Sequence, residues 1–578
     1  AWRLLLCVLV IGVTGGLVRK LEQQSEFPAP RFPSVALEAP TSVGDVMSYA
    51  RQAARNRAAA FGGGLGISTA GETIAVVLSR CYNPHIVEAM RLALIEREIT
   101  PVVLTRAQGM AEVWAYESAL RSPSAGACVG QSSIPGQSVF EAGFTEGRNP
   151  GNGVPYPRKL RNWIRSARPD LFQRVFPDLS LELEPEPANE EPNLGFSGNS
   201  SDGVIAYLQE HPEIDGVYSA GTWYQEAGNL GPFANKWRGT TSWDRFTIIS
   251  NVPSYPADVW TLTEEKNIES IAFAERFHLT DPEGTDLEDE ISPELARRWA
   301  SGVYERGHNM LGPNMATGRF ARTTVSYPAM SGEWIPRSPI STPTGVIAGT
   351  TNHVGVHPLI EMYYEDGYLT RVEGGGLYGD LARMWLSEPG YPNINTAQYP
   401  YYDGKPGFYW LHEIAMGTNP KWFRPPDRDM SIRAVNERLK SGYLHIGVGA
   451  SLEHEPSAAR RSVSWQEFAE EGNLPFYHGL HLHLYFPTYT VDIRNSNRSV
   501  DILRDGRMVS LDDPEVRALA SRYGNADEIL AEDWIHEIPG INAPGSFAEY
   551  ARDPYPSHKE VNDKVLNGTY EYFYPPVN

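Results

Sequence analysis

Residues 476–492 read FYHGLHLHLYFPTYTVD, a run in which histidine alternates with apolar residues. Such alternation predicts a β-strand, because neighbouring side chains of a strand point to opposite faces. His481 and His483 would share one face, and the leucines between and after them the other. One face is therefore typical of a core. The opposite face would present two imidazoles at a fixed spacing, which suits a metal ion.

The length and composition of the chain restrict the possible functions. A chain of 578 residues predicts two or three domains, and 41% hydrophobic residues provide enough material for their cores. The net charge of −21 argues against a nucleic-acid partner, because phosphate binding needs a basic surface. The three cysteines form neither a disulfide framework nor a zinc-finger spacing. Any metal ion would therefore be held by histidine and carboxylate side chains.

The first residues, 1–20, combine Arg3 with an apolar run from Leu4 to about Val18. The run is short for a membrane span of roughly 20 residues and is typical of a signal peptide. We therefore expect a signal peptide or an N-terminal anchor, and hence an exported (periplasmic or secreted) or membrane-anchored protein. If the segment is an ordinary buried helix instead, a cytoplasmic protein is expected.

A linker is predicted at 21–68, followed by an N-terminal α/β domain at 69–322. Within it, ETIAVVLS (72–79) predicts a strand, NPHIVEAMRLALIERE (83–98) a helix, and TPVVLT (100–105) a second strand. This strand–helix–strand order predicts a largely parallel sheet. Further units of the same sheet are predicted at 201–221 and 246–252.

Short β-like runs between glycine and proline turns dominate 323–500, which we interpret as a C-terminal β-rich α+β metal-binding domain. The tripeptide EDG at 365–367 predicts a hairpin, and GDLARMWL at 379–386 predicts a helix. The overall fold class is therefore α/β. Residues 501–578 form a C-terminal extension, for which both an ordered wrap and a dimer arm are open.

The histidines are concentrated in the second half, where six of the fourteen lie between residues 412 and 483. His445 lies in the apolar run GYLHIGVG, and Glu413 lies in the apolar run LHEIAMG. A single histidine in such a strand is more often a core residue than a ligand. A glutamate, however, is rarely buried without a partner. Two histidine-bearing strands together with such a glutamate are best explained by a bound cation.

Five segments of the second half follow one another in a fixed order: SGEWIPRSP, EDGYLTRVEGG, HEIAMGTNP, GYLHIGVG and LHLHLYFPTYTVD. This series resembles the thermophilic metallo-aminopeptidases, the aminopeptidase T and aminopeptidase S group, which show similar segments in the same order. The group's divergent relatives include dihydroxypyridine dioxygenase and nitroanthranilate aminohydrolase, and the resemblance covers most of residues 70–495. HLTDPEGTDL (278–287) is also similar to the family, and we interpret its PEGTDL part as a solvated loop, with a substrate-side loop as the alternative.

The resemblance implies a ligand set for one or two divalent ions (Zn, Co, Mn or Fe). Glu413 would also act in catalysis, by orienting a water molecule or carrying its proton. Three of the implied ligands have simpler interpretations. Glu333 could be a solvated turn residue, Glu413 could be the partner of an ion pair in the core, and His483 could lie outside the metal's contact shell. The implied metal ligands are Glu333, Glu413, His445, His481 and His483.

The chain departs from the family at two places. His483 takes the position of an aspartate, and the segment GVGASLEHEP lacks the tyrosine that the aminopeptidases carry there. A two-metal site needs anionic ligands, so a mononuclear site is equally open. Two histidines and one carboxylate are the pattern of non-haem iron enzymes.

Three hypotheses follow from the sequence. The first is a metal-dependent hydrolase of the aminopeptidase or amidohydrolase type, acting on an amide or amine bond of a small molecule or short peptide. The second is a mononuclear Fe(II) ring-cleaving dioxygenase. The third is a non-catalytic binding protein on the same scaffold. The resemblance also implies a homodimer.

Overall fold

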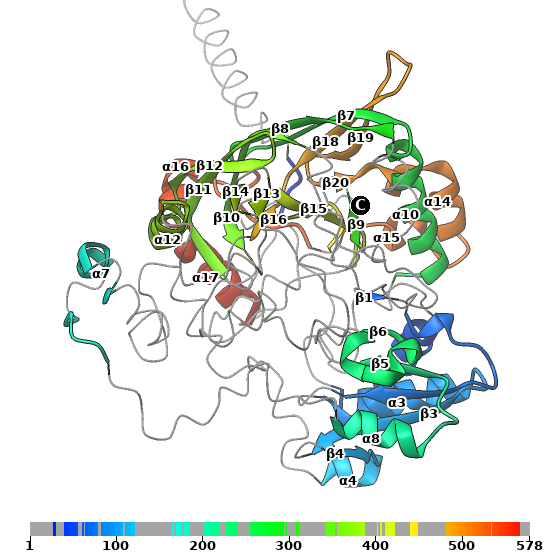
Figure 1. Cartoon of the computed structure of the whole chain (residues 1–578). Helices are drawn as coiled ribbons and strands as arrows, with labels where there is room; N and C mark the ends of the chain where they lie inside the picture. The colour runs from blue at the N-terminus through cyan, green and yellow to red at the C-terminus, as the bar shows by residue number, and fades with distance from the viewer. Residues whose placement is uncertain are drawn as a thin grey trace, which may run out of the picture.

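The structure is a computed structural model, and Figure 1 shows its fold. Glu333 and the predicted units at 1–20 and 246–252 lie outside the residues that it describes. These described residues are 27–30, 40–55, 61–62, 64–78, 82–107, 110–121, 165–166, 169–175, 179–184, 202–219, 227–240, 255–293, 296, 308–310, 342–352, 355–387, 401–402, 405–406, 411–421, 440–448, 481–532 and 534–566.

A six-stranded sheet forms in the N-terminal part, with the order β1-β6-β5-β2-β3-β4. β2 pairs in parallel with β3 and β5, and β5 pairs in parallel with β6, whereas β4 and β1 are antiparallel edge strands. The predicted, largely parallel sheet is therefore confirmed. The strands are β1 (Phe61–Gly62), β2 (Thr73–Val77), β3 (Thr100–Ala107), β4 (Met110–Val113), β5 (Gly216–Ser219) and β6 (Trp237–Thr240).

The central strand β2 is buried on both faces, which explains its uninterrupted apolar sequence. Ile74 and Val76 belong to one core cluster, and Ala75 and Val77 to another. Helix α3 (Pro84–Ile95) packs in the first cluster and is capped at its N-terminus by Asn83, whose side chain accepts hydrogen bonds from backbone N–H groups of the first turn. The predicted strand–helix–strand unit is thus confirmed.

An antiparallel eight-stranded sheet has the order β12-β11-β10-β8-β7-β18-β19-β20. The predicted hairpin is confirmed between β11 and β12, where Asp366 and Gly367 have φ values of 50° and 79°. β7 and β8 belong to this sheet, although they precede residue 322, where we predicted the domain boundary. The strands are β7 (Ala274–Asp281), β8 (Thr285–Glu290), β10 (Thr344–Asn352), β11 (Gly355–Glu365), β12 (Tyr368–Gly374), β18 (Thr488–Ile493), β19 (Ser499–Arg504) and β20 (Arg507–Met508).

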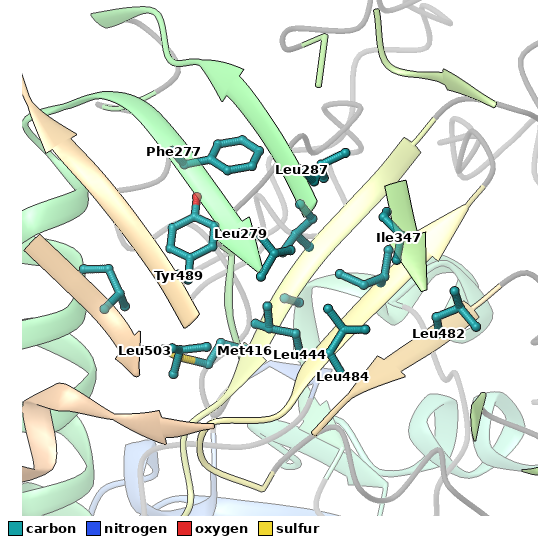
Figure 2. Close-up of a cluster of buried hydrophobic side chains, with 14 of the residues drawn as sticks. Phe277, Leu279, Leu287, Ile347, Met416, Leu444, Leu482, Leu484, Tyr489 and Leu503 are labelled. Atoms are coloured by element: carbon teal, nitrogen blue, oxygen red, sulfur yellow. The ribbon is translucent and has the colours of Figure 1, made fainter. Parts of the chain in front are cut away.

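A second antiparallel sheet of four strands, in the order β17-β16-β15-β9, packs on the first. Figure 2 shows how Leu444, Leu482 and Leu484 meet side chains such as Leu279 and Ile347 of the larger sheet. The β-rich second half that we predicted is therefore confirmed. The four strands are β9 (His308–Met310), β15 (Leu411–Gly417), β16 (Leu444–Val448) and β17 (His481–Leu484), and the short strands β13 (Tyr401–Tyr402) and β14 (Lys405–Pro406) pair separately.

Helices flank the larger sheet at both ends (Figure 1). α10 packs against α14 near β18 and β19, whereas α12 and α16 pack against β11. Residues 501–566 of the C-terminal extension thus complete the sheet through β19 and β20 and pack onto their own chain. No helix within the described part of the chain is long and apolar enough to cross a membrane.

The described helices include the predicted helix at 379–386, which is confirmed as part of α12. The α-helices are α2 (Met47–Arg55), α3 (Pro84–Ile95), α4 (Tyr116–Leu120), α7 (Pro169–Val175), α8 (Asp202–Glu210), α10 (Ala257–Ile271), α12 (Gly376–Ser387), α14 (Pro514–Ala520), α15 (Ala526–Ile529), α16 (Phe547–Arg552) and α17 (Tyr555–Leu566). The 3-10 helices are η1 (Gly44–Val46), η2 (Leu65–Ile67), η3 (Ala227–Lys236) and η8 (Val509–Asp512).

Candidate functional site

His445 and His483 form a buried pair on adjacent strands of the four-stranded sheet. They are register partners of β16 and β17, and their ring centroids lie 5.8 Å apart at an interplanar angle of 70°. Their exposed fractions are only 2% and 1%. The leucines that flank His483 in the sequence, Leu482 and Leu484, point into the core (Figure 2). The alternation predicted for this strand is therefore confirmed.

The predicted ligands Glu413 and His481 occupy the neighbouring row of the sheet. Both are register partners of Gly447, which lies two residues after His445 on β16. Cross-strand partners share a face, as do residues two apart in a strand. Positions 413 and 481 therefore belong to the histidine-bearing face by register, although the side chains there lie outside the described residues.

The buried pair has a spacing that one ion can bridge. Two imidazoles bound to one ion, each with a metal–nitrogen distance of about 2 Å, have ring centroids roughly 5–6 Å apart. The observed 5.8 Å lies in this range. Among the described side chains, however, no group of three or more His, Cys, Asp or Glu residues could hold a metal ion. The two histidines therefore fit an ion, and completing its shell requires side chains from positions such as 413 and 481.

A third buried imidazole, His357 on β11, was missed by the sequence analysis. It is fully buried, and its Nδ1 lies 2.9 Å from the carbonyl oxygen of Pro358. Burial, with a smaller contribution from the nearby His483, lowers the pKa of His357 to about 4. His357 is therefore neutral at pH 7, the form in which imidazole binds metals. Its segment, HPLIEM, lies far along the chain from the histidines at 412–483, and no sequence pattern groups it with them.

Two buried acids lie where β7 meets the turn to β8: Asp281 ends β7, and Glu283 lies in the turn. Asp281 and Glu283 are only 6% and 3% exposed. The carboxylate of Asp281 accepts hydrogen bonds from the backbone N–H groups of Glu283 (2.9 Å) and Phe486 (3.0 Å). Burial raises the pKa of Asp281 to about 7 and the pKa of Glu283 well above its usual range. Our interpretation of PEGTDL as a solvated loop is therefore wrong, because Glu283, Thr285 and Leu287 are buried and residues 285–287 belong to β8.

Glu283 lies beside the strand that carries His483. A Cβ atom placed on Gly349 of β10 would lie 3.7 Å from Oε2 of Glu283 and 3.4 Å from the backbone oxygen of His483. The hydroxyl of the next residue, Thr350, lies 3.2 Å from both carboxyl oxygens of Glu283. The described part of the site thus combines the neutral imidazole of His357 with two carboxyl groups whose pKa values are raised by burial, which lowers its negative charge.

No protein-family model matches the sequence, and a search of the curated proteins finds no match. Among solved structures, the chain is similar to 2,5-dihydroxypyridine dioxygenase from Pseudomonas putida KT2440, with 11% identity, a TM-score of 0.37, and coverage of 82% of this chain and 99% of that one. It is also similar to AmpT from Thermus thermophilus, with 12% identity, a TM-score of 0.31, and coverage of 81% and 100%. Similarities this distant carry no argument about the family or the reaction of this chain.

Proposed function

We propose that this protein is a metal-dependent enzyme that binds a single divalent ion on the histidine-bearing face of the four-stranded sheet. The observation that supports it most is the buried pair of His445 and His483, at a spacing that one ion can bridge. Glu413 and His481, in the neighbouring row, would complete the shell. A single ion is preferred because a two-metal site needs several anionic ligands, and the described acids resist ionisation.

The reaction that we propose first is hydrolysis of an amide or amine bond in a small molecule or short peptide. The ion, when bound, would supply Lewis acidity to water and to the scissile group. The buried imidazoles of His445 and His483 would hold the ion, and Glu413, which lies in the neighbouring row by register, would hold a proton. The resemblance of five ordered segments to the metallo-aminopeptidases supports this assignment.

The low charge of the described site favours a second candidate, a mononuclear Fe(II) ring-cleaving dioxygenase. Two histidines and one carboxylate, here His445, His483 and Glu413, are the usual ligand set of such iron enzymes. The neutral imidazole of His357 and the raised pKa of Glu283 would suit an uncharged or anionic aromatic substrate. The nature of the bound metal separates the two candidates.

The test is the metal content of protein purified without added metal, measured by mass spectrometry for the wild type, His445→Ala and His483→Ala. His278→Ala is the matched control, because His278 is exposed on β7 and pairs with Asp286. We expect about one ion per chain in the wild type and the control, and loss of that ion in both site variants. Zinc or manganese would direct assays to amide substrates, and iron to oxygen uptake with hydroxylated aromatic compounds. A metal-free wild type that also fails to bind added Zn²⁺ or Fe²⁺ would contradict the proposal.

A further inference from the structure

A buried chain of hydrogen bonds connects Glu283 to the C-terminal extension. The hydroxyl of Thr350 contacts the Glu283 carboxyl and lies 3.0 Å from the hydroxyl of Tyr550 on α16. The Tyr550 hydroxyl lies 3.1 Å from Nε2 of His558 on α17. All four side chains belong to residues that are at most 4% exposed. The chain therefore runs through the protein interior from the edge of the site to a helix more than 200 residues away in sequence.

A second route joins the same helix to the histidine strand through stacked rings. The ring of His558 lies 4.6 Å from that of His536, which stacks at 4.0 Å on Tyr485. Tyr485 directly follows β17. The backbone N–H of the next residue, Phe486, donates to Asp281, which in turn accepts from the backbone N–H of Glu283. Both routes thus lead from His558 of the extension to Glu283 in the turn between β7 and β8. The second route passes through the residues that directly follow β17.

A role in packing alone does not explain this arrangement. A helix that only covers a sheet needs apolar side chains, whereas buried hydroxyl, carboxyl and imidazole groups lower stability unless every one is paired. Here the polar groups lead to a carboxyl that flanks Gly349 together with the backbone of His483. The Tyr550 hydroxyl contacts the Thr350 hydroxyl and so limits its orientations. The Thr350 hydroxyl in turn limits the orientations of the Glu283 carboxyl.

We propose that the C-terminal extension is a functional part of the site, in which Tyr550 is a positioning residue that acts through Thr350 to hold the Glu283 carboxyl beside β17. His558 is the outer partner that fixes the Tyr550 hydroxyl. The inference rests on the proposed metal function only in that the positioned strand carries His483.

The first experiment compares Tyr550→Phe with Tyr523→Phe by hydrogen–deuterium exchange. Tyr523 is the matched control, since it lies in the same extension and donates a hydrogen bond to Asp258 of α10 (2.7 Å) but is 53% exposed. In Tyr550→Phe we expect amide exchange at residues 481–486 to rise roughly fivefold or more, as for a lost buried hydrogen bond. The control should leave this segment unchanged. If Tyr550→Phe accelerates exchange only within 546–566, the extension contributes only packing contacts and the proposal fails.

The second experiment tests the connection through Thr350. Thr350→Val removes the hydroxyl at nearly constant shape, and Thr350→Ser keeps it. We expect Thr350→Val to reproduce the effect of Tyr550→Phe, the double variant to be no worse than either single one, and Thr350→Ser to resemble the wild type. Additive effects in the double variant would mean that the two hydroxyls act independently, which would overturn the proposal.

The metal site provides a readout that packing alone would not change. In cobalt(II)-loaded protein, we expect Tyr550→Phe to alter the visible absorption spectrum and Tyr523→Phe to leave it unaltered, because the spectrum reports the geometry around the ion. An unaltered spectrum in Tyr550→Phe would count against positioning at the ion. If the wild type binds no cobalt, the proposed function fails, and the exchange measurements still decide whether Tyr550 positions β17.

Discussion

We expect the Asp281→Asn variant to gain stability relative to the wild type as the pH rises from about 4 to about 7. Burial raises the pKa of Asp281 from 3.8 to about 7. Between these values the unfolded chain releases the proton while the folded protein retains it, so the wild type loses free energy of unfolding as the pH rises. Below this interval both states are protonated, and above it both are ionised. A difference of roughly 3 between the two pKa values corresponds to about 4 kcal/mol of free energy of unfolding. The wild type loses this stability over the pH interval, and the asparagine variant does not.

The substitution also has a cost that does not depend on pH. Asp281 accepts from two backbone N–H groups with its two oxygens, and asparagine offers only one oxygen. The variant should therefore be about 1–3 kcal/mol less stable at pH 4, where the aspartic acid is uncharged. The buried acid is therefore detected by how the stability difference between Asp281→Asn and the wild type changes with pH. The size of that difference at a single pH does not detect it.

The assay is urea unfolding at several pH values between 4 and 8. Because a chain with several cores need not unfold in one step, unfolding is followed by pulsed hydrogen exchange at the residues of β7. Asp286→Asn serves as the control, because the Asp286 side chain is 72% exposed in the same hairpin. Parallel stability curves for Asp281→Asn and the wild type across this pH range would refute the reasoning.

Three further substitutions test other parts of the fold, each by urea unfolding that is followed by pulsed hydrogen exchange at the residues of the substituted segment. Lys440→Ala should cost about 3–5 kcal/mol, because it leaves Glu532, its buried ion-pair partner at 2.9 Å, without its nearest cation. Gly442→Ala should cost about 2–4 kcal/mol, because Gly442 has φ +80° and a Cβ atom would overlap the backbone oxygen of Gly506. Gly367→Val should cost about 1–2 kcal/mol at its φ of 79°. A loss below 0.5 kcal/mol in any of them would contradict the corresponding contact or turn.

Local patterns in the sequence were enough to predict the elements that surround the site. HLHL predicted the two faces of β17, and the uninterrupted apolar run of β2 matched a strand that is buried on both sides. EDG predicted the turn at Asp366 and Gly367 because few residues other than Gly, Asn and Asp adopt positive φ there. In each case the physical cause lies within a few residues of the chain.

The buried acids and His357 could not be predicted in this way. Glu283 is charged in isolation and follows a proline, which reads as a solvated turn. Its burial results from Thr350, which in turn contacts Tyr550, and these partners are separated along the chain by 67 and 200 residues. Such contacts depend on which strands become neighbours, and one sequence without this information does not reveal them. For the same reason, the sequence could not show that the C-terminal extension contacts the turn between β7 and β8 through Thr350.

The order of strands in the larger sheet has a consequence for how the chain is synthesised. β7 pairs with β8 on one side and with β18 on the other, roughly 200 residues later in the sequence. At a translation rate of about 5–20 residues per second, the second edge of β7 waits roughly 10–40 s for its partner. During that time it presents unpaired backbone groups, which are prone to aggregation. The six-stranded N-terminal sheet is complete once Thr240 has emerged from the ribosome. Nascent chains stalled between β8 and β18 should therefore bind chaperones through their second half while the first half is already folded.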